Sequence, residues 1–323
     1  MAGAGGVRVA PVRVMTTRSA TAAAIAALLA GCGTDSPGET VVAAAGQATL
    51  LGASAAGVYW TSPGTAGTRV VGSSLEALPG EAQELAMATG PAVHADDHVV
   101  LAQAGVVLRA RLGAPLARAV STNAEALGEI PGEPPRLVWT LADKLSWGTS
   151  EAERTVTLVR TTRVDHVRAT ARRIYAAVDG TSERRLVYLD LADGLVNNLT
   201  ASSTFASAFP SAPDGATYQG RIVGADDDGA YWLVEQRPSR RAVLVALPAR
   251  GEPTVVLPTI QQASGFFVTA EAFYWQEGDT LLTAPRAGGS ASIAAELDRT
   301  AGAIADGFVY YATPGGAIER LAL

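Results

Sequence analysis

The sequence contains a single cysteine, Cys32, among 323 residues. One cysteine excludes an intramolecular disulfide, so the chain must fold on an apolar core. Hydrophobic residues make up 48% of the composition, which is enough for one large domain. The sequence also lacks a P-loop, a dinucleotide fingerprint, an EF-hand loop and a nucleophile elbow. These absences leave no standard catalytic or cofactor motif, and we expect no cofactor.

Long hydrophobic runs are missing as well. No apolar run reaches the roughly 18 residues that a membrane-spanning helix requires. The run at the N-terminus, Ala20 to Ala30, covers 11 residues and is apolar except for Thr21. That length is too short to span a bilayer and fits the hydrophobic region of a signal peptide.

The flanks of this run are typical of a bacterial lipoprotein signal. Arg8, Arg13 and Arg18 precede it without any acidic residue, and it ends in Leu29-Ala30-Gly31-Cys32. This ending resembles the bacterial lipobox, in which a branched residue and two small ones precede the cysteine that is lipidated. We therefore expect cleavage between Gly31 and Cys32, and a lipid anchor on Cys32. The alternative is a simple signal peptide with an incidental cysteine, and either Met1 or Met15 can begin the signal.

Cleavage would make the chain more acidic. The net charge of the full sequence is -6, and residues 1–31 hold three arginines and no acid, so the mature charge is -6 - 3 = -9. A chain of this charge is a poor nucleic-acid binder and gains no electrostatic attraction to anionic lipid. We expect no nucleic-acid partner, a monomer, and membrane attachment through the lipid alone. Residues 32–39 are polar and aperiodic, and we assign them to a flexible tether.

A repeated strand pattern fills residues 40–323. An apolar strand that usually carries an aromatic residue recurs at steps of 40, 39, 37, 56, 43 and 36 residues, measured at its third position. The seven strands are Val58-Tyr59-Trp60, His98-Val99-Val100, Leu137-Val138-Trp139, Ile174-Tyr175-Ala176, Ala230-Tyr231-Trp232, Phe273-Tyr274-Trp275 and Val309-Tyr310-Tyr311. Four of the five tryptophans fall in this register. Repetition at about 40 residues predicts a β-propeller.

The segments around these strands repeat too. Turn residues such as Asp96-Asp97 and Asp306-Gly307 precede several of them, which is a hairpin signal. A second strand follows in each unit, such as Val243-Leu244-Val245 in the fifth and Val156 to Val159 in the third. A short outer strand such as Thr254-Val255-Val256 then ends the unit. We predict an all-β propeller with seven blades, with six or eight as alternatives.

One of the repeated strands carries a family resemblance. Val58-Tyr59-Trp60-Thr61-Ser62 resembles the Tyr-Trp-Thr-Asp motif of low-density-lipoprotein-receptor-type propellers, with Ser62 in place of the Asp. Related signals occur in TolB-like and NHL-like bacterial propellers. The resemblance implies the architecture and carries over no functional residue, because the paired aromatics pack between blades.

The closure of the ring can also be predicted from the repeat. The last unit ends at Leu323 without an outer strand. Thr40-Val41-Val42 lies 20 residues before Trp60 and reads like the outer strand at Thr254. An unclosed propeller would leave open strand edges. We therefore predict that residues 40–42 pair with the strand that ends near Leu321.

Chemistry-bearing residues are few. His94-Ala95-Asp96-Asp97-His98 is the one histidine and carboxylate cluster, and His94, Asp96 and His98 would be its zinc ligands. Turn chemistry already accounts for both aspartates, so we predict no metal site. The remaining histidine, His166, lies in a strand-like run and reads as a surface residue.

An insertion explains the step of 56 residues. Residues 201–218 are mostly small and polar and include Phe205, Phe209 and Tyr218. These three aromatics are candidate ligand-binding residues if the segment is a flap. The alternative is a tolerated surface insertion, which loops permit.

Two functions remain open on these grounds. The first is a lipid-anchored binding or scaffold module at the cell envelope, with a protein or glycan ligand; the absence of a catalytic motif favours it. The second is an extracytoplasmic hydrolase or lyase with its site at the mouth of the propeller channel. Paired carboxylates or clustered histidines at that mouth would favour the enzyme. Gly33 rather than Asp follows the cysteine, which by resemblance to enterobacterial sorting favours the outer membrane where a cell has one.

Overall fold

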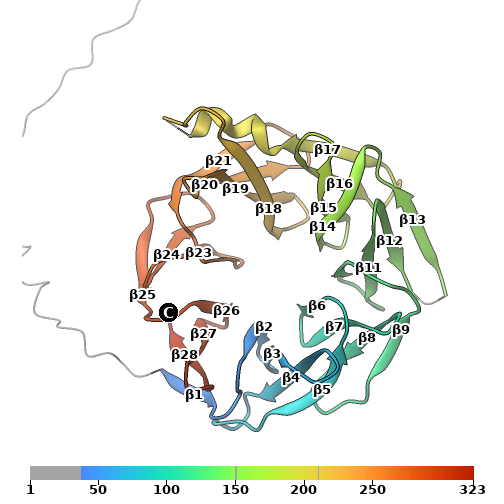
Figure 1. The fold of residues 1–323 in the computed structure, drawn as a ribbon, viewed down its shortest axis with the longest axis vertical. Helices are drawn as coiled ribbons and strands as arrows, with labels where there is room; N and C mark the ends of the chain where they lie inside the picture. The colour runs from blue at the N-terminus through green and yellow to red at the C-terminus, as the bar shows by residue number, and fades with distance from the viewer. Residues whose placement is uncertain (1–37, 150, 210) are drawn as a thin grey trace, which may run out of the picture. The chain divides into compact units, whose positions relative to one another are not determined.

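The computed structural model describes residues 38–149, 151–209 and 211–323, and these residues form seven four-stranded sheets. The sheets are arranged around a common axis, as Figure 1 shows. This arrangement is a seven-bladed β-propeller. It confirms the all-β prediction and the count of seven blades. The expected signal peptide with Gly31 and Cys32, and the tether up to residue 37, lie outside the described residues.

Each blade uses its first strand as the innermost one and its second strand for the aromatic repeat. The first strands are β2 (Thr49–Ser54), β6 (Ala92–Ala95), β10 (Ala126–Ile130), β14 (Thr161–Ala169), β18 (Thr217–Ala225), β22 (Gly265–Val268) and β26 (Ala301–Ala305). The second strands are β3 (Gly57–Pro63), β7 (His98–Gln103), β11 (Arg136–Leu141), β15 (Arg173–Gly180), β19 (Gly229–Arg237), β23 (Ala272–Glu277) and β27 (Phe308–Ala312).

The outer half of each blade consists of the third and fourth strands. The third strands are β4 (Thr68–Ser74), β8 (Val106–Ala110), β12 (Lys144–Gly148), β16 (Arg184–Asp190), β20 (Arg241–Pro248), β24 (Thr280–Pro285) and β28 (Ile318–Ala322). The fourth strands of blades 1 to 6 are β5 (Gln83–Ala88), β9 (Ala117–Val120), β13 (Glu153–Thr157), β17 (Val196–Ala201), β21 (Thr254–Gln261) and β25 (Ser292–Glu296). Blade 7 takes its fourth strand from the other end of the chain, β1 (Glu39–Val42).

The aromatic pairs hold adjacent blades together. Tyr59 and Trp60 are neighbours on β3 and are both fully buried. Trp60 packs toward blade 7 with Val41, whereas Tyr59 packs toward blade 2 with Val99. Successive side chains of a strand point to opposite faces of the sheet, so one blade can supply core to both neighbours. Burial of a large side chain of this kind stabilises the fold by about 2–3 kcal/mol.

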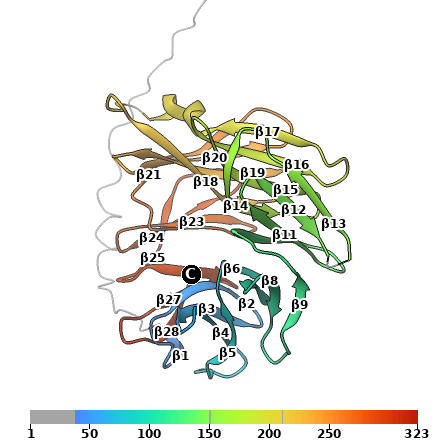
Figure 2. The same cartoon turned by 45° about the vertical axis from the view of Figure 1, so that its right-hand side comes forward.

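The predicted ring closure is confirmed. β1 pairs antiparallel with β28, with Thr40 opposite Glu319 and Val42 opposite Ile318. The two strands lie side by side in Figures 1 and 2. The pairing begins at Glu39, one residue earlier than the predicted segment, because Glu39 lies opposite Arg320. Glu39 therefore belongs to the strand and not to the tether.

The strand assignment in the third blade was wrong. Val156 was taken for part of the third strand, but β13 is the fourth strand, and the third is β12. β12 is short and contains Trp147, the one tryptophan outside the aromatic register. Leu145 and Trp147 are buried on alternate positions of this strand, and five residues are too few to reveal that alternation in the sequence.

The insertion between blades 4 and 5 contains a short 3-10 helix, η1 (Ser202–Ala208). Phe205 and Phe209 are buried in the core cluster that joins these blades, and Tyr218 packs against Phe209 with ring centroids 5.4 Å apart. The next residues, 211–215, are exposed. The inner part of the insertion is therefore packed core, and the surface excursion is confined to the part that follows.

Glycines allow neighbouring first strands to approach one another. Leu50 covers Gly302, Val167 covers Gly128 and Val268 covers Gly224, each pair from adjacent blades. His94 covers Gly52 in the same way. A β-carbon at any of these glycines would crowd the covering side chain, so the narrow inner end of the blades depends on their absence.

Helices contribute little to the described chain. Within residues 38–323, apart from 150 and 210, the structure holds no helix with the length and hydropathy needed to cross a membrane.

Candidate functional site

Two cavities lie at opposite ends of the first strands. In each antiparallel blade, the first turn and the second turn lie at opposite ends of the sheet. The crossover-side cavity, of about 1020 Å³, is lined by the starts of β2, β22 and β26 and by a second turn at residues 312–316. The hairpin-side cavity, of about 1060 Å³, is lined by β2, β6, β10, the end of β14 and the first turn at Asp96 and Asp97. Both volumes suit a small ligand.

A charged network borders the hairpin-side cavity. His98 lies between two carboxylates, with Nδ1 3.2 Å from Asp97 Oδ1 and Nε2 3.2 Å from Glu129 Oε2. Arg109 donates from Nε to the same oxygen of Glu129 at 2.9 Å, and Arg111 pairs with Asp97. The network links β7 and β8 of blade 2 to β10 of blade 3.

The pKa values in this network follow from the pairing. The hydrogen bond with Glu129 raises the pKa of His98 above its usual 6.5, despite the opposing effect of burial. Burial alone would raise the pKa of Glu129, but the hydrogen bonds and charges of His98 and Arg109 outweigh it and lower that pKa. His98 and Glu129 are only 12% and 9% exposed, so solvent screens their attraction weakly. The pair is therefore a cation bound to an anion at neutral pH.

His94 points away from this network. Its ring stacks near Tyr59 of blade 1, with centroids 5.2 Å apart, and Nε2 is buried without a hydrogen-bond partner. Burial lowers the pKa of His94, so the ring is neutral. His94 fills the position that Leu50, Val167 and Val268 fill elsewhere in the ring.

The three candidate metal ligands occupy one turn but diverge. His94 faces blade 1, His98 faces blade 3, and Asp96 is exposed with a φ of 52°. Among the described residues, no group of three or more His, Cys, Asp or Glu side chains could hold a metal ion together. His166 is held apart from both other histidines by its bond to Asp165, from Nδ1 at 3.0 Å.

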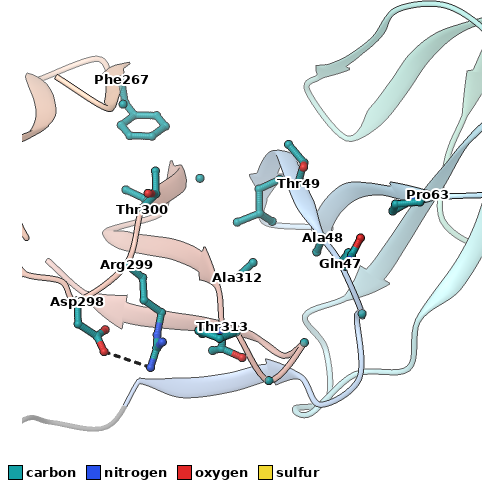
Figure 3. Close-up of a pocket in the computed structure, with 18 of the residues that line it drawn as sticks. Gln47, Ala48, Thr49, Pro63, Phe267, Asp298, Arg299, Thr300, Ala312 and Thr313 are labelled. Carbon is teal, nitrogen blue, oxygen red and sulfur yellow. Dashed lines mark ion pairs between the residues drawn. The ribbon is translucent and has the colours of Figure 1, made fainter. Parts of the chain in front are cut away.

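The crossover-side cavity has a different chemistry, which Figure 3 shows. Gln47, Thr49 and Thr300 are exposed around it, and Phe267 forms one of its walls. Within the described part of the chain, these three polar side chains form no hydrogen bond. Arg299 pairs with Asp298 at 3.3 Å, and Asp298 is 77% exposed. The cavity thus offers uncommitted hydroxyl and amide groups beside one aromatic ring.

The candidate ligand residues from the insertion lie elsewhere. Phe205, Phe209 and Tyr218 belong to the core between blades 4 and 5 and line neither of these two cavities. Conversely, Glu129, Arg168, Gln47 and Thr300 line the cavities but were not singled out from the sequence. Each is a single polar residue in or beside a strand, and no local motif marks it.

Comparisons with known proteins return the fold. No known family model matches the sequence, and no curated protein matches it. Among solved structures, an oligogalacturonate lyase from Vibrio parahaemolyticus has a TM-score of 0.58 at 8% identity, over 85% of this chain and 90% of that one. An oligogalacturonate lyase in complex with manganese has a TM-score of 0.55 at 9% identity, over 83% and 86%. A protein from Lactobacillus plantarum has a TM-score of 0.55 at 14% identity, over 87% and 89%. At such identities the likeness shows a shared β-propeller fold.

Proposed function

We propose that this protein is a β-propeller that is lipid-anchored at the cell envelope through Cys32 and binds a glycan in its crossover-side cavity. One observation carries the proposal. Gln47, Thr49 and Thr300 present free hydrogen-bonding groups in that cavity beside the ring of Phe267. Hydroxyl and amide groups both donate and accept hydrogen bonds, as sugar hydroxyls do, and an aromatic ring offers an apolar face.

The same cavity lacks the parts of a hydrolytic site. Its charged lining residues are Asp298 and Arg299, which pair with each other, and no histidine lines it. General acid and base catalysis requires two groups with different pKa values close to the substrate. The cavity lining supports binding, and the protein then acts as a binding or scaffold module.

Glycan binding can be tested with cavity variants. Soluble cell-wall glycan fragments are titrated into the protein and into a Gln47→Ala, Thr300→Val double variant. Each lost hydrogen bond costs about 1 kcal/mol, so the double variant should bind roughly 10-fold to 30-fold more weakly. Thr254→Val is the matched control, because Thr254 is exposed on β21 far from the cavity lining. Equal affinity of the double variant and the wild type would reject the proposal.

The anchor has its own test. Cys32→Ser should abolish metabolic palmitate labelling and release the protein from the membrane fraction, because the thiol is the point of lipid attachment. Labelling that persisted in Cys32→Ser would reject the anchor. Membrane fractionation of the wild type tests the expectation of the outer membrane, in a cell that has one, which rests on Gly33.

A catalytic role is the second candidate, and the hairpin-side cavity favours it. His98, held protonated between Asp97 and Glu129, has the form of a general acid at a cavity wall. The fold is shared with oligogalacturonate lyases, so oligogalacturonate is the first substrate to assay. A lyase would generate unsaturated products that absorb ultraviolet light, and a hydrolase would generate reducing ends. Activity that disappears in His98→Gln would favour the enzyme over the binding module.

A further inference from the structure

Arg168 occupies an unusual place in the molecule. It lies near the end of β14 and lines the hairpin-side cavity with its neighbours Val167 and Ala169. Val167 and Ala169 pack into the core toward blade 3, so Arg168 is on the opposite face of the strand. Its side chain is exposed to the solvent of the cavity. The innermost strand thus presents a guanidinium group to the cavity.

This guanidinium has no acidic partner among the described residues. Its one hydrogen bond is a long contact of 3.5 Å from Nη1 to the carbonyl oxygen of Val167. Burial lowers the pKa of Arg168, and no carboxylate offsets that effect. Arg173 and Arg286 are different, because neighbouring tyrosines and aspartates outweigh burial and raise their pKa values.

The acids of the hairpin-side cavity are engaged elsewhere or lie at its rim. Asp97 is paired with Arg111 and His98, and Glu129 with Arg109 and His98. Asp96 and Glu133 have exposed side chains. His94, in the same cavity wall, is kept neutral by burial. Arg168 is therefore the charge in this wall that the protein leaves uncompensated.

Its neighbours on β14 do not compensate it either. Asp165 pairs with Arg184 and His166. Burial lowers the pKa of His166, and the charges of Arg184 and Arg168 lower it further against the pull of Asp165. On the adjacent first strand, β18, burial likewise lowers the pKa of Arg221, partly offset by Glu235.

A desolvated cation without a counterion is costly to keep. Its retention is understood if a ligand supplies the counterion, because perturbed charges of this kind cluster at binding sites. A planar guanidinium donates two parallel hydrogen bonds to a carboxylate or phosphate group. We infer that the hairpin-side cavity is an anion-binding site in which Arg168 holds a carboxylate or phosphate group of a small ligand. The site lies at the other end of the channel from the proposed glycan cavity, and the inference goes beyond that proposal.

Two probes distinguish the possible sources of the anion. Glucuronate and glucose differ only in the carboxylate at one carbon, and inorganic phosphate represents the phosphate arm. Each is titrated into the full chain by calorimetry at constant ionic strength. We expect binding of glucuronate or of phosphate, with no detectable binding of glucose. The arm that binds identifies the source.

Variants at Arg168 test its role. Arg168→Gln should weaken anion binding by about tenfold to hundredfold, the usual effect of losing a charged hydrogen-bonding group. Arg168→Lys should retain phosphate binding better than glucuronate binding, because a lysine cannot form the bidentate pair. Arg250→Gln is the matched control, since Arg250 is exposed between β20 and β21 and forms no ion pair with another described residue. It should bind as the wild type does.

Stability provides an independent readout. Removing an uncompensated charge should leave the melting temperature of Arg168→Gln unchanged or raise it, whereas removing a structural residue would lower it. The inference is overturned if the wild type binds neither anion, if Arg168→Gln binds as tightly as the wild type, or if Arg168→Gln lowers the melting temperature. The Gln47 and Thr300 variants should leave anion binding intact, so failure of the glycan proposal and failure of this inference are separable.

Discussion

Arg320 donates a hydrogen bond from Nε to Glu39 Oε2 at 2.7 Å, although 281 positions separate the two residues in the chain. Arg320 also lies over the ring of Phe308, 4.3 Å from its centroid. The ion pair sits beside the β1 and β28 pairing that completes blade 7. The first strand of the fold and the last are thus joined by backbone, side-chain and packing contacts at one place.

Ring closure should dominate stability at the N-terminal end of the propeller. Deletion of residues 40–45 removes Val41 and Val42, which are buried, at about 2 kcal/mol for each. It also exposes the edge of β28. We expect a lower melting temperature and aggregation, because an open strand edge pairs with other chains.

The control is deletion of residues 33–37, which leaves β1 intact. It should shift the melting temperature by far less than the deletion of residues 40–45. Equal shifts for the two deletions would show that β1 does not hold the ring closed.

His98 should make stability depend on pH. Its pKa is raised in the folded protein above the usual 6.5, so the folded state binds the proton more tightly than the unfolded state. The stabilisation is complete below the unfolded pKa and is lost as the pH rises through the raised folded pKa. Melting temperatures between about pH 6 and pH 9 should therefore fall more steeply for the wild type than for His98→Gln. Parallel curves would contradict the ion pair with Glu129.

His166 supplies a matched control of opposite sign. Burial lowers its pKa, so it reduces stability as the pH falls below the unfolded value. His166→Gln should flatten the acid side of the curve and leave the alkaline side unchanged.

Replacement of His94 by valine should stabilise the fold. Nε2 of His94 is buried without a partner, which costs about 1–3 kcal/mol. Valine fills the matching position over Gly128 and Gly224. Because the pKa of His94 is lowered, the wild type loses stability as the pH falls through about 6.5, and the gain in His94→Val should be largest on the acid side. Urea denaturation at acid and at neutral pH measures it, and a destabilised variant would refute the packing role.

The insertion between blades 4 and 5 should be cut first in limited proteolysis. Residues 211–215 are exposed, whereas Phe205 and Phe209 are buried. Cleavage is therefore expected after residue 210 and not within η1, because proteases need accessible chain. Phe205→Ala should cost about 3–5 kcal/mol of stability, measured by urea denaturation. First cuts within β23 or β24 would contradict the packed blades.

Local regularities in the sequence determined the architecture. Each blade repeats an aromatic strand near a fixed spacing, and turns such as Asp306-Gly307 have the positive φ values, 51° and 77°, that the hairpin signal predicts. The ring closure followed from one missing strand at one end and one additional strand at the other. These features involve neighbours in sequence or a simple period, so the sequence alone specifies them.

Tertiary structure alone decided which side chains meet. His98 pairs with Glu129, 31 residues away and in another blade, and the walls of both cavities combine residues from three or four blades. Strand alternation divides side chains between two faces, but it does not state which residue of the next blade lies opposite. That register is set by packing between blades, with glycines such as Gly52 and Gly128 fixing how closely first strands approach. Arg168 is for this reason an ordinary strand arginine in the sequence and an uncompensated cation in the folded protein.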